Sequence, residues 1–348
     1  MDKEFAIKNW ERINKTIRHE EPDQVPVFLH VNGPFITKYN GIDPYQYYHD
    51  PALMVECQLK VRERFYNLTG VFPDLSMAVE PSALGAKLKW TADGTVWIIP
   101  HIKTLEDVEQ LEIPNPEAAG YMARAIHTYR YMRKAAGEGV PVSFNNVHSP
   151  WGVAALMRGT SQIMEDLILQ PSLVKRLVEK TTDTIIHWLH KIKSEVPQGT
   201  FQRILVWDDL SSFVGPKHFR EFILPIYQKV FGSFPETERW YHNDANATSI
   251  LEALADAGIE CFHLGYEVNL SDAKRRIGDR VCLMGNVAPL TVLRNGTPRE
   301  VMEACRMIID KGAAGGGFIL AAGGYIDEGT PAENIDTMIE AAEKYGKY

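Results

Sequence analysis

The sequence lacks the features that direct a protein into or across a membrane. No apolar run in its 348 residues approaches the roughly 18 residues that span a bilayer. The first residues, Met1 to Glu4, show no secretory signal. Only four cysteines are present, without the C-x-x-C spacing of many metal and redox sites. We therefore expect a cytoplasmic protein with buried, reduced cysteines: Cys57, Cys261, Cys282 and Cys305.

A concentration of positive charge is also missing. The chain has 37 Lys and Arg residues against 45 Asp and Glu residues, and its basic residues are scattered rather than gathered in a stripe. This argues against binding to nucleic acid or to an anionic membrane, so the expected partner is a small molecule or another protein. The glycine run at 315–317 precedes an apolar run instead of following one, which argues against a dinucleotide fingerprint.

What the sequence does have is a repeated alternation of short apolar runs and helical patterns. The apolar runs occupy residues 25–31, 71–77, 140–147, 204–209, 239–244, 260–264, 281–286 and 317–322. Strands that alternate with helices pair in parallel, and eight such units close into a (β/α)8 barrel. With 45% hydrophobic and 24% charged residues, the chain can bury one large core. We predict an α/β fold in which residues 1–348 form a single (β/α)8 (TIM) barrel domain.

Local signals predict the remaining elements. Helical patterns lie at residues 4–18, 50–68, 116–136 and 161–196, the last broken at Pro171-Ser172. The segment 87–99 alternates as a strand does and turns at Asp93-Gly94, which predicts a hairpin inserted over the barrel mouth. Thr297 and Thr330 are each followed by proline and then, at the third position, by glutamate, so both predict a capping box.

Polar residues follow most of the predicted strands. In a (β/α)8 barrel the reactive residues come from the C-terminal ends of the strands. The residues at those ends are His30 and Asn32, Asp74 and Glu80, Asn145, Asn146 and His148, Asp208 and Asp209, His242 and Asp244, His263, Asn286, and Gly323 to Tyr325.

His242 and Asp244 form the sharpest short feature of the sequence. Residues two apart in a strand face the same side, so both side chains can point into the barrel mouth. An imidazole beside a carboxylate can ligate a divalent metal ion, act as a base with its orienting acid, or close the loop by hydrogen bonding. Spacing alone leaves these three interpretations open.

Two other strand ends offer polar groups. Adjacent strand residues face opposite sides, so only one of Asp208 and Asp209 can enter the mouth, and we favour Asp209. It would bind a cation, an amine or a hydroxyl, or hydrogen-bond a loop. Asn145 and Asn146 are poor strand formers beside His148, so they either satisfy loop backbone groups or orient a polar ligand.

The remaining candidates carry weaker signals. Glu80 lies beside a proline, and such a carboxylate is most often on the surface. Trp207 and Tyr325 could line a pocket, although aromatic residues at a barrel rim more often serve packing. The turn at Gly323-Gly324 precedes a capped helix and could let an anionic ligand group approach backbone donors.

Several motifs resemble those of one family. They are the segment 285–289 (GNVAP), the segment 215–217 (GPK) with 219–225, and the segment 317–320 (GFIL) followed by Thr330-Pro331. Together they resemble the uroporphyrinogen decarboxylase superfamily, which includes cobalamin-dependent methyltransferases. The resemblance extends over nearly the whole chain and implies a single (β/α)8 barrel with its cleft at the strand C-termini.

One departure favours the methyltransferase branch. True decarboxylases of this superfamily carry an Arg-Gln-Ala-Gly-Arg segment after the first strand, whose arginines bind the carboxylates of the substrate. The matching residues 30–34 here read HVNGP, so both arginines are absent. A porphyrinogen with its many acidic side arms would lack counter-ions in this protein.

The methyltransferases of the superfamily also imply a zinc site. They bind zinc through a His-x-Cys pair and a later cysteine, with a nearby glutamate as a further ligand. In this chain His242 matches the histidine, Asp244 replaces the first cysteine, Gly324 replaces the last, and Glu80 matches the glutamate. The resemblance thus implies zinc held by His242, Asp244 and Glu80, with oxygen ligands in place of thiolates.

The implied activity is demethylation of a small methoxylated or methylated compound, with transfer of the methyl group to a separate corrinoid (cobalamin) protein. His242, Asp244 and Asp209 would be catalytic. The substrate would be held by Asn145, Asn146, His148, Trp207, Tyr241, Tyr325, His30 and Asp74.

Two alternatives stay open. One is a metal-free decarboxylase of another acid, in which Asp74 or Asp209 stabilises a protonated ring. The other is a non-catalytic barrel that binds a ligand. We expect no nucleic-acid or membrane partner, and the sequence leaves a homodimer open.

Overall fold

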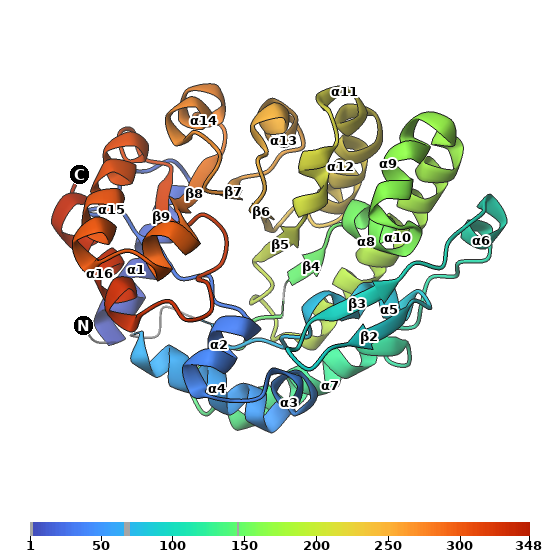
Figure 1. Ribbon diagram of the computed structural model, residues 1–348, viewed down its shortest axis with the longest axis horizontal. Coiled ribbons are helices and arrows are strands. Elements are labelled where there is room, and N and C mark those ends of the chain that lie inside the picture. Colours follow the sequence, from blue (N-terminus) through green and yellow to red (C-terminus); the bar gives the residue numbers. More distant parts are fainter. Residues whose placement is uncertain (1–2, 66–69, 145) are drawn as a thin grey trace.

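The core of the protein is a parallel β-sheet that curves around a central axis, with the long helices outside it (Figure 1). The computed structural model describes residues 3–65, 70–144 and 146–348. The sheet runs in the order β1-β9-β8-β7-β6-β5-β4. Its strands are β1 (Val27–Phe28), β4 (Asn146–His148), β5 (Arg203–Trp207), β6 (Glu238–Asn243), β7 (Cys261–Leu264), β8 (Cys282–Val287) and β9 (Phe318–Ala322).

The eighth predicted strand, at 71–77, does not form as a strand. Within the described part of the chain, Val71 makes one parallel bridge, to Val142, and the ladder is otherwise open between β1 and β4. Pro73 has no N–H to donate, and Ser76 adopts a φ of +52°, so the chain leaves the extended conformation and enters the turn η1 (Ser76–Ala78). This irregular segment lines a cavity at the C-terminal ends of the strands.

The helices agree with most of the sequence patterns. The α-helices are α1 (Lys3–Ile17), α2 (Gly33–Asn40), α3 (Pro44–His49), α4 (Pro51–Arg64), α5 (Val79–Ala83), α6 (Leu105–Glu109), α7 (Gly120–Ala135), α8 (Pro150–Arg158), α9 (Thr160–Leu169), α10 (Pro171–Glu195), α11 (Pro216–His218), α12 (Leu224–Gly232), α13 (Leu251–Asp256), α14 (Leu270–Ile277), α15 (Pro298–Gly312) and α16 (Ala332–Tyr345). The 3-10 helices are η2 (Asp209–Phe213) and η4 (Thr248–Ile250), and the π-helices are η3 (Phe219–Ile223) and η5 (Pro289–Arg294). None of the helices among the described residues has the length and apolarity needed to cross a membrane.

The two predicted capping boxes have different outcomes. Thr297 caps α15 as predicted: its side chain accepts from the Glu300 N–H while the Glu300 carboxylate accepts from the Thr297 N–H. The prediction for Thr330 is wrong. Its hydroxyl instead donates to the carbonyl of Asp327 at 2.8 Å, and α16 begins after Pro331 without a side-chain cap.

Side chains alternate between the barrel interior and the helix layer along the strands. In β6, Trp240 packs in the interior with Leu205 and Met284, whereas Tyr241 packs outward against the helices. Strands covered on both faces read as continuous apolar runs, which is why the sequence revealed them. All four cysteines are buried, as expected.

The predicted hairpin is present as β2 (Lys87–Trp90) and β3 (Val96–Ile99), paired antiparallel. Val96 and Ile98 pack with Ala78 and Ala86, outside the segment that carries η1 and α5. The hairpin packs against the segment that carries η1 and α5, and none of its residues lines the cavity at the C-terminal ends of the strands.

Candidate active site

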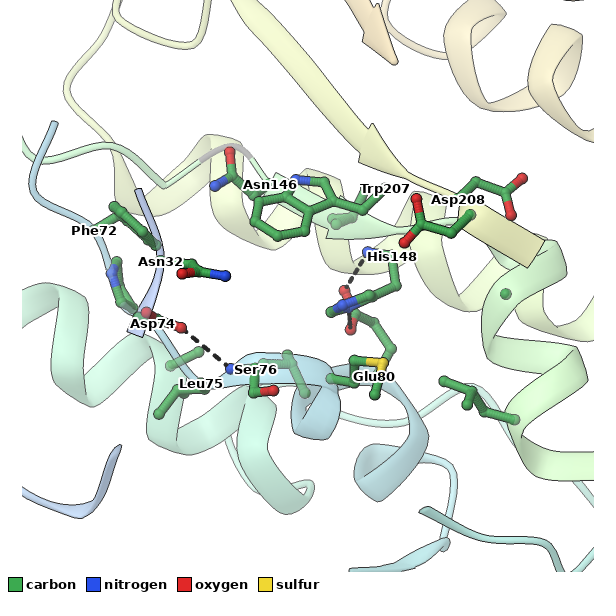
Figure 2. A pocket seen from close by; sticks show the side chains of 18 of the residues that line it. Asn32, Phe72, Asp74, Leu75, Ser76, Glu80, Asn146, His148, Trp207 and Asp208 are labelled. Carbon is green, nitrogen blue, oxygen red and sulfur yellow. Dashed lines mark hydrogen bonds and ion pairs between the residues drawn. The ribbon is translucent and has the colours of Figure 1, made fainter. Parts of the chain in front are cut away.

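A cavity of about 480 Å³ lies at the C-terminal ends of β4 and β5 (Figure 2). The irregular segment 72–80 forms the opposite wall, and Asn32, after β1, closes one side. The polar and aromatic residues that line it include Asn32, Asp74, Ser76, Glu80, Asn146, His148, Trp207, Asp208, Asp209 and Tyr325. A pocket at this end of the strands is where (β/α)8 barrels place their chemistry.

The cavity is acidic. Among the described residues that line it, none is Lys or Arg, whereas four carry carboxyl groups. Asp74 is buried and accepts a hydrogen bond from Tyr47 Oη at 3.2 Å. Burial raises the pKa of Asp74 to about 6, because the surroundings penalise its charged form.

Glu80 and His148 form a pair across the cavity wall. His148 Nδ1 lies 2.9 Å from Glu80 Oε2, and the backbone N–H of His148 donates to Glu80 Oε1 at 3.1 Å (Figure 2). Burial lowers the pKa of His148, but the charge and hydrogen bond of Glu80 outweigh it, so the net shift is upward. Glu80 therefore positions His148, and sequence reasoning missed this pair.

Asp208 and Asp209 diverge, as strand alternation predicts. Asp208 is buried and accepts hydrogen bonds from Tyr227 Oη and from the Ser211 N–H, and burial raises its pKa to about 7. Asp209 is 46% exposed and lies on the cavity wall. Of the two, Asp209 is therefore the more open to the ligand space, although both border the cavity.

Asp209 meets Asp244 and His242 at the mouth. The Asp244 N–H donates to Asp209 Oδ1 at 3.0 Å, and His242 Nε2 lies 3.8 Å from the same oxygen. The three side chains place their ligand atoms within 4.8 Å of one another. Burial, followed by the charge of Asp209 and a hydrogen bond with it, raises the pKa of Asp244 to about 7. Burial likewise raises the pKa of Asp209.

His242 and Asp244 therefore converge as predicted, but the imidazole is sealed. His242 is fully buried, and the rings of Trp207 and Tyr325 lie 5.6 and 5.2 Å from it. Trp207 and Tyr325 also line the cavity, whereas His242 does not. Only the Nε2 edge faces the two carboxylates, and this nitrogen is buried without a hydrogen-bond partner.

The remaining predicted residues fall into distinct places. Asn146, His148, Trp207, Tyr325 and Asp74 line the cavity, while Asn145 lies outside the described residues.

His30 and Tyr241 do not line the cavity. His30 lies below it among other histidines, where burial lowers its pKa. Tyr241 faces the helix layer, where its hydroxyl donates to the Asp208 carbonyl at 3.1 Å. Its neighbour His242 faces inward, so the alternation of the strand turns Tyr241 away from any substrate.

Glu80 does not join the cluster that contains His242. Within the described residues the acidic partners of His242 are Asp209 and Asp244, whereas the Glu80 carboxylate is held by His148. Gly324 does lie against the cluster: a Cβ built there would be 3.2 Å from Asp244 Cβ. Its φ of +125° favours glycine, so a cysteine side chain would be strained at this position.

Sequence reasoning named His263 at a strand end but gave it no role. In the sheet register His263 pairs directly with His242, and their Nδ1 atoms lie 2.9 Å apart. Burial lowers the pKa of both rings to about 3. The useful signal was that both histidines sit near the ends of consecutive parallel strands.

Comparison with known proteins agrees with this architecture. The family model of uroporphyrinogen decarboxylase matches residues 8–345. The chain belongs to the uroporphyrinogen decarboxylase family. Within this family, a uroporphyrinogen decarboxylase of Mannheimia succiniciproducens is 25% identical and covers 98% of both chains. That of Vibrio cholerae is 27% identical over 77% of this chain and 76% of its own.

A solved structure shares the fold. A methyltransferase from Methanosarcina mazei superposes with a TM-score of 0.82 at 21% sequence identity, covering 96% of this chain and 98% of the other. The α/β barrel predicted from the sequence is thereby confirmed for this member of the uroporphyrinogen decarboxylase family, although its hydrogen-bonded ladder has seven strands.

Proposed function

We propose that this protein is a methyltransferase that takes a methyl group from a small methoxylated or methylated compound and gives it to a corrinoid protein. The observation that carries the proposal is the pair Asp209 and Asp244, held together beside His242 at the edge of a small acidic cavity that Asp209 lines. Such a pair can supply a proton to the atom that loses its methyl group.

The charge of the cavity argues against a porphyrinogen substrate. Carboxylate side arms need Arg or Lys partners, and the described lining residues include neither. Asp74, which is ionised above its pKa of about 6, and Asp209 on the wall would instead repel them. A neutral ether or a methylated ammonium ion fits this cavity, and a cation would also be attracted by the faces of Trp207 and Tyr325.

A neutral donor requires a proton at the leaving atom. The methyl group passes to the reduced cobalt of the partner, which supplies the electron pair of the new bond, while the electrons of the broken bond stay on the oxygen or nitrogen of the donor. The oxygen of an ether then takes one proton, whereas a methylated ammonium ion leaves as a neutral amine without one. Asp244, with its pKa raised to about 7, holds a proton below about pH 7 and is hydrogen-bonded to Asp209, which lies on the wall.

The donor set at the mouth fits the zinc ion that the resemblance implies. His242 Nε2 is buried, unpartnered and directed at two carboxylates, so a divalent ion would satisfy it together with Asp209 and Asp244. With zinc bound there, Asp244 would be a deprotonated ligand, and the Lewis acidity of the ion would take the place of its proton at the leaving atom. Glu80 would take no part, because it holds His148.

Other residues would bind and orient the donor. Trp207 and Tyr325 offer flat apolar surfaces for an aromatic ring or a methylated ammonium group. Asn146 and Asp74 offer hydrogen-bonding groups on the facing walls. The open mouth would admit the cobalt of the corrinoid partner.

The proposal is tested with purified protein, chemically reduced cob(I)alamin as the methyl acceptor, and a panel of methoxyaromatic compounds and methylamines. We expect methylcobalamin to appear in the visible spectrum with at least one donor, and Asp244→Ala to abolish its formation. If no donor of the panel yields a methylated corrinoid, either with cob(I)alamin or with a corrinoid protein as acceptor, the proposal is overturned. Release of carbon dioxide from an acid would favour a decarboxylase.

A further inference from the structure

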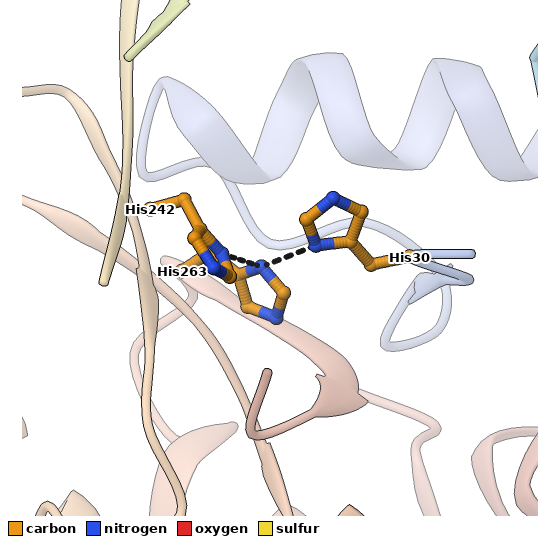
Figure 3. Close-up of side chains that lie close together, drawn as sticks. All are labelled: His30, His242 and His263. Atoms are coloured by element: carbon orange, nitrogen blue, oxygen red, sulfur yellow. Dashed lines mark hydrogen bonds between the residues drawn. The ribbon is translucent and has the colours of Figure 1, made fainter. Parts of the chain in front are cut away.

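Three buried imidazoles meet beneath the cavity (Figure 3). His30 follows β1, His242 lies in β6 and His263 lies in β7. His263 Nδ1 lies 3.1 Å from His30 Nδ1 and 2.9 Å from His242 Nδ1. The exposed fraction of each residue is 7% or less, so water does not compete for these nitrogens.

Hydrogen bonding alone does not account for this arrangement. His263 Nε2 lies 2.8 Å from the carbonyl oxygen of Ala322, which can only accept, so this nitrogen carries the proton. In the neutral ring His263 Nδ1 then has a single lone pair. Two further ring nitrogens, from His30 and His242, are directed at that one lone pair. One lone pair accepts one strong hydrogen bond, so the second of these nitrogens has no hydrogen bond with His263.

A metal ion would use all three nitrogens. We propose that His30, His242 and His263 form a transition-metal site through their Nδ1 atoms, with zinc as the ion that fits best. Zinc binds imidazole nitrogen at about 2.0–2.1 Å, so two ligand nitrogens on one tetrahedral ion lie about 3.4 Å apart. The two separations from His263 Nδ1 need only a few tenths of an ångström of expansion, and all three ligand atoms lie within 4.8 Å of one another.

One of the three histidines has the second-shell contact of a metal ligand. A ligating histidine usually donates its other N–H to a carbonyl or carboxylate, which fixes the ring and its tautomer. His263 does so to Ala322, whereas His242 Nε2 lies 3.8 Å from Asp209 and makes no hydrogen bond. Three neutral nitrogens suit zinc, cobalt or another ion of intermediate softness, and do not suit magnesium or calcium.

This site differs from the carboxylate set at the mouth. It uses His242 Nδ1, whereas the set with Asp209 and Asp244 uses His242 Nε2. Three protein ligands also leave the fourth position of a tetrahedral ion open, as in catalytic zinc sites. The inference does not rest on the proposed function, because metal binding is measured without any methyl donor.

The test is metal binding by the intact protein after chelator treatment, dialysis and reloading with zinc. We expect one tightly held zinc ion per chain by elemental analysis, at the three histidines, with an affinity measured by chelator competition. An ion held by Asp209 and Asp244 at the mouth would be a second, weaker one that dialysis removes. His263→Gln and His30→Gln should each weaken binding at least 100-fold. Asp244→Asn and the exposed control His187→Gln should change it less than threefold.

A second measurement needs no variant. X-ray absorption at the zinc edge counts the imidazole ligands of the wild-type protein, and we expect three. One imidazole with oxygen ligands, or an affinity that falls with Asp244→Asn but not with His263→Gln, would overturn the three-histidine site. Failure to retain zinc at one ion per chain would overturn it as well.

Discussion

The backbone N–H of Asp244 donates to Oδ1 of Asp209 at 3.0 Å, and this bond ties the end of β6 to the end of β5. It brings two carboxyl groups together in surroundings that resist charge. Burial comes first among the causes that raise their pKa values, followed for Asp244 by the charge of its neighbour. The two groups therefore titrate as a pair that retains one proton near neutral pH.

The first prediction concerns the pH dependence of methyl transfer. If the pair donates a proton, kcat/KM falls as the pH rises through about 7, the pKa of Asp244 in the folded protein. Asp244→Asn should lower the rate on the order of 100-fold or more and remove that limb of the profile. Rates measured from pH 5.5 to 9 check this. A wild-type profile that is flat across pH 7 would contradict the role of the pair.

The second prediction concerns stability and Asp208. The pKa of this buried side chain rises to about 7 on folding, from an ordinary value of 3.8. Its stabilising effect is therefore fully present below pH 3.8 and is lost as the pH rises to about 7. Between pH 5 and pH 8 the wild type should lose unfolding free energy, and Asp208→Asn should lose less of it, by on the order of 1–3 kcal/mol.

Urea unfolding at the two pH values measures this difference. Asp183→Asn, on the outer surface of α10 beside Lys229, is the matched control and should leave the pH dependence unchanged. An identical pH slope in the wild type and in Asp208→Asn would show that Asp208 is not the group responsible.

The third prediction concerns Glu80 and His148. Glu80→Gln removes the charge that keeps the pKa of His148 above its ordinary value, so burial then dominates and that pKa falls. Because Glu80 is buried, the change should also lower the unfolding free energy by about 1–3 kcal/mol. NMR titration of the His148 ring checks the pKa. An unchanged titration curve would mean that the two side chains are apart in solution.

The fourth prediction concerns ligand charge. Because the described lining residues of the cavity include carboxyl groups and neither Lys nor Arg, neutral methoxybenzenes or methylated ammonium ions should bind more tightly than polycarboxylates. Trp188 and Trp207 line the cavity, so calorimetry and tryptophan fluorescence both report on it. Tight binding of uroporphyrin that Trp207→Ala abolishes would contradict the prediction that the cavity selects ligands by their charge.

Much of the fold could be predicted from the sequence because parallel strands are buried on both faces. The strands from β5 to β9 appear as continuous apolar runs, and α1 and α4 fall where the helical patterns place them. The segment after Val71 was misjudged because its apolar residues line a cavity wall in an irregular conformation. Thr330 was misjudged because its hydroxyl found a nearer acceptor in Asp327.

The site was harder to predict because it depends on neighbours that are distant in the sequence. Strand alternation correctly separated Asp208 from Asp209, and applied consistently it would also have excluded Tyr241, the outward neighbour of His242. The partnership of Glu80 with His148 joins residues on opposite walls, and no local pattern encodes it.

His263 was missed for a related reason. His263 lies beside His242 only because the register of β6 and β7 pairs the two residues. A lone histidine in an apolar run resembles a core residue, and only the sheet places the two rings side by side.

The most direct measurement follows the methyl group itself. A donor labelled with carbon-13 in its methyl group is incubated with the protein and cob(I)alamin, and carbon-13 NMR locates the label. The account predicts labelled methylcobalamin and demethylated donor in equal amounts, both absent with Asp244→Ala. A label that stays on the donor for every neutral and cationic compound tried, while an acid substrate releases carbon dioxide, would contradict it.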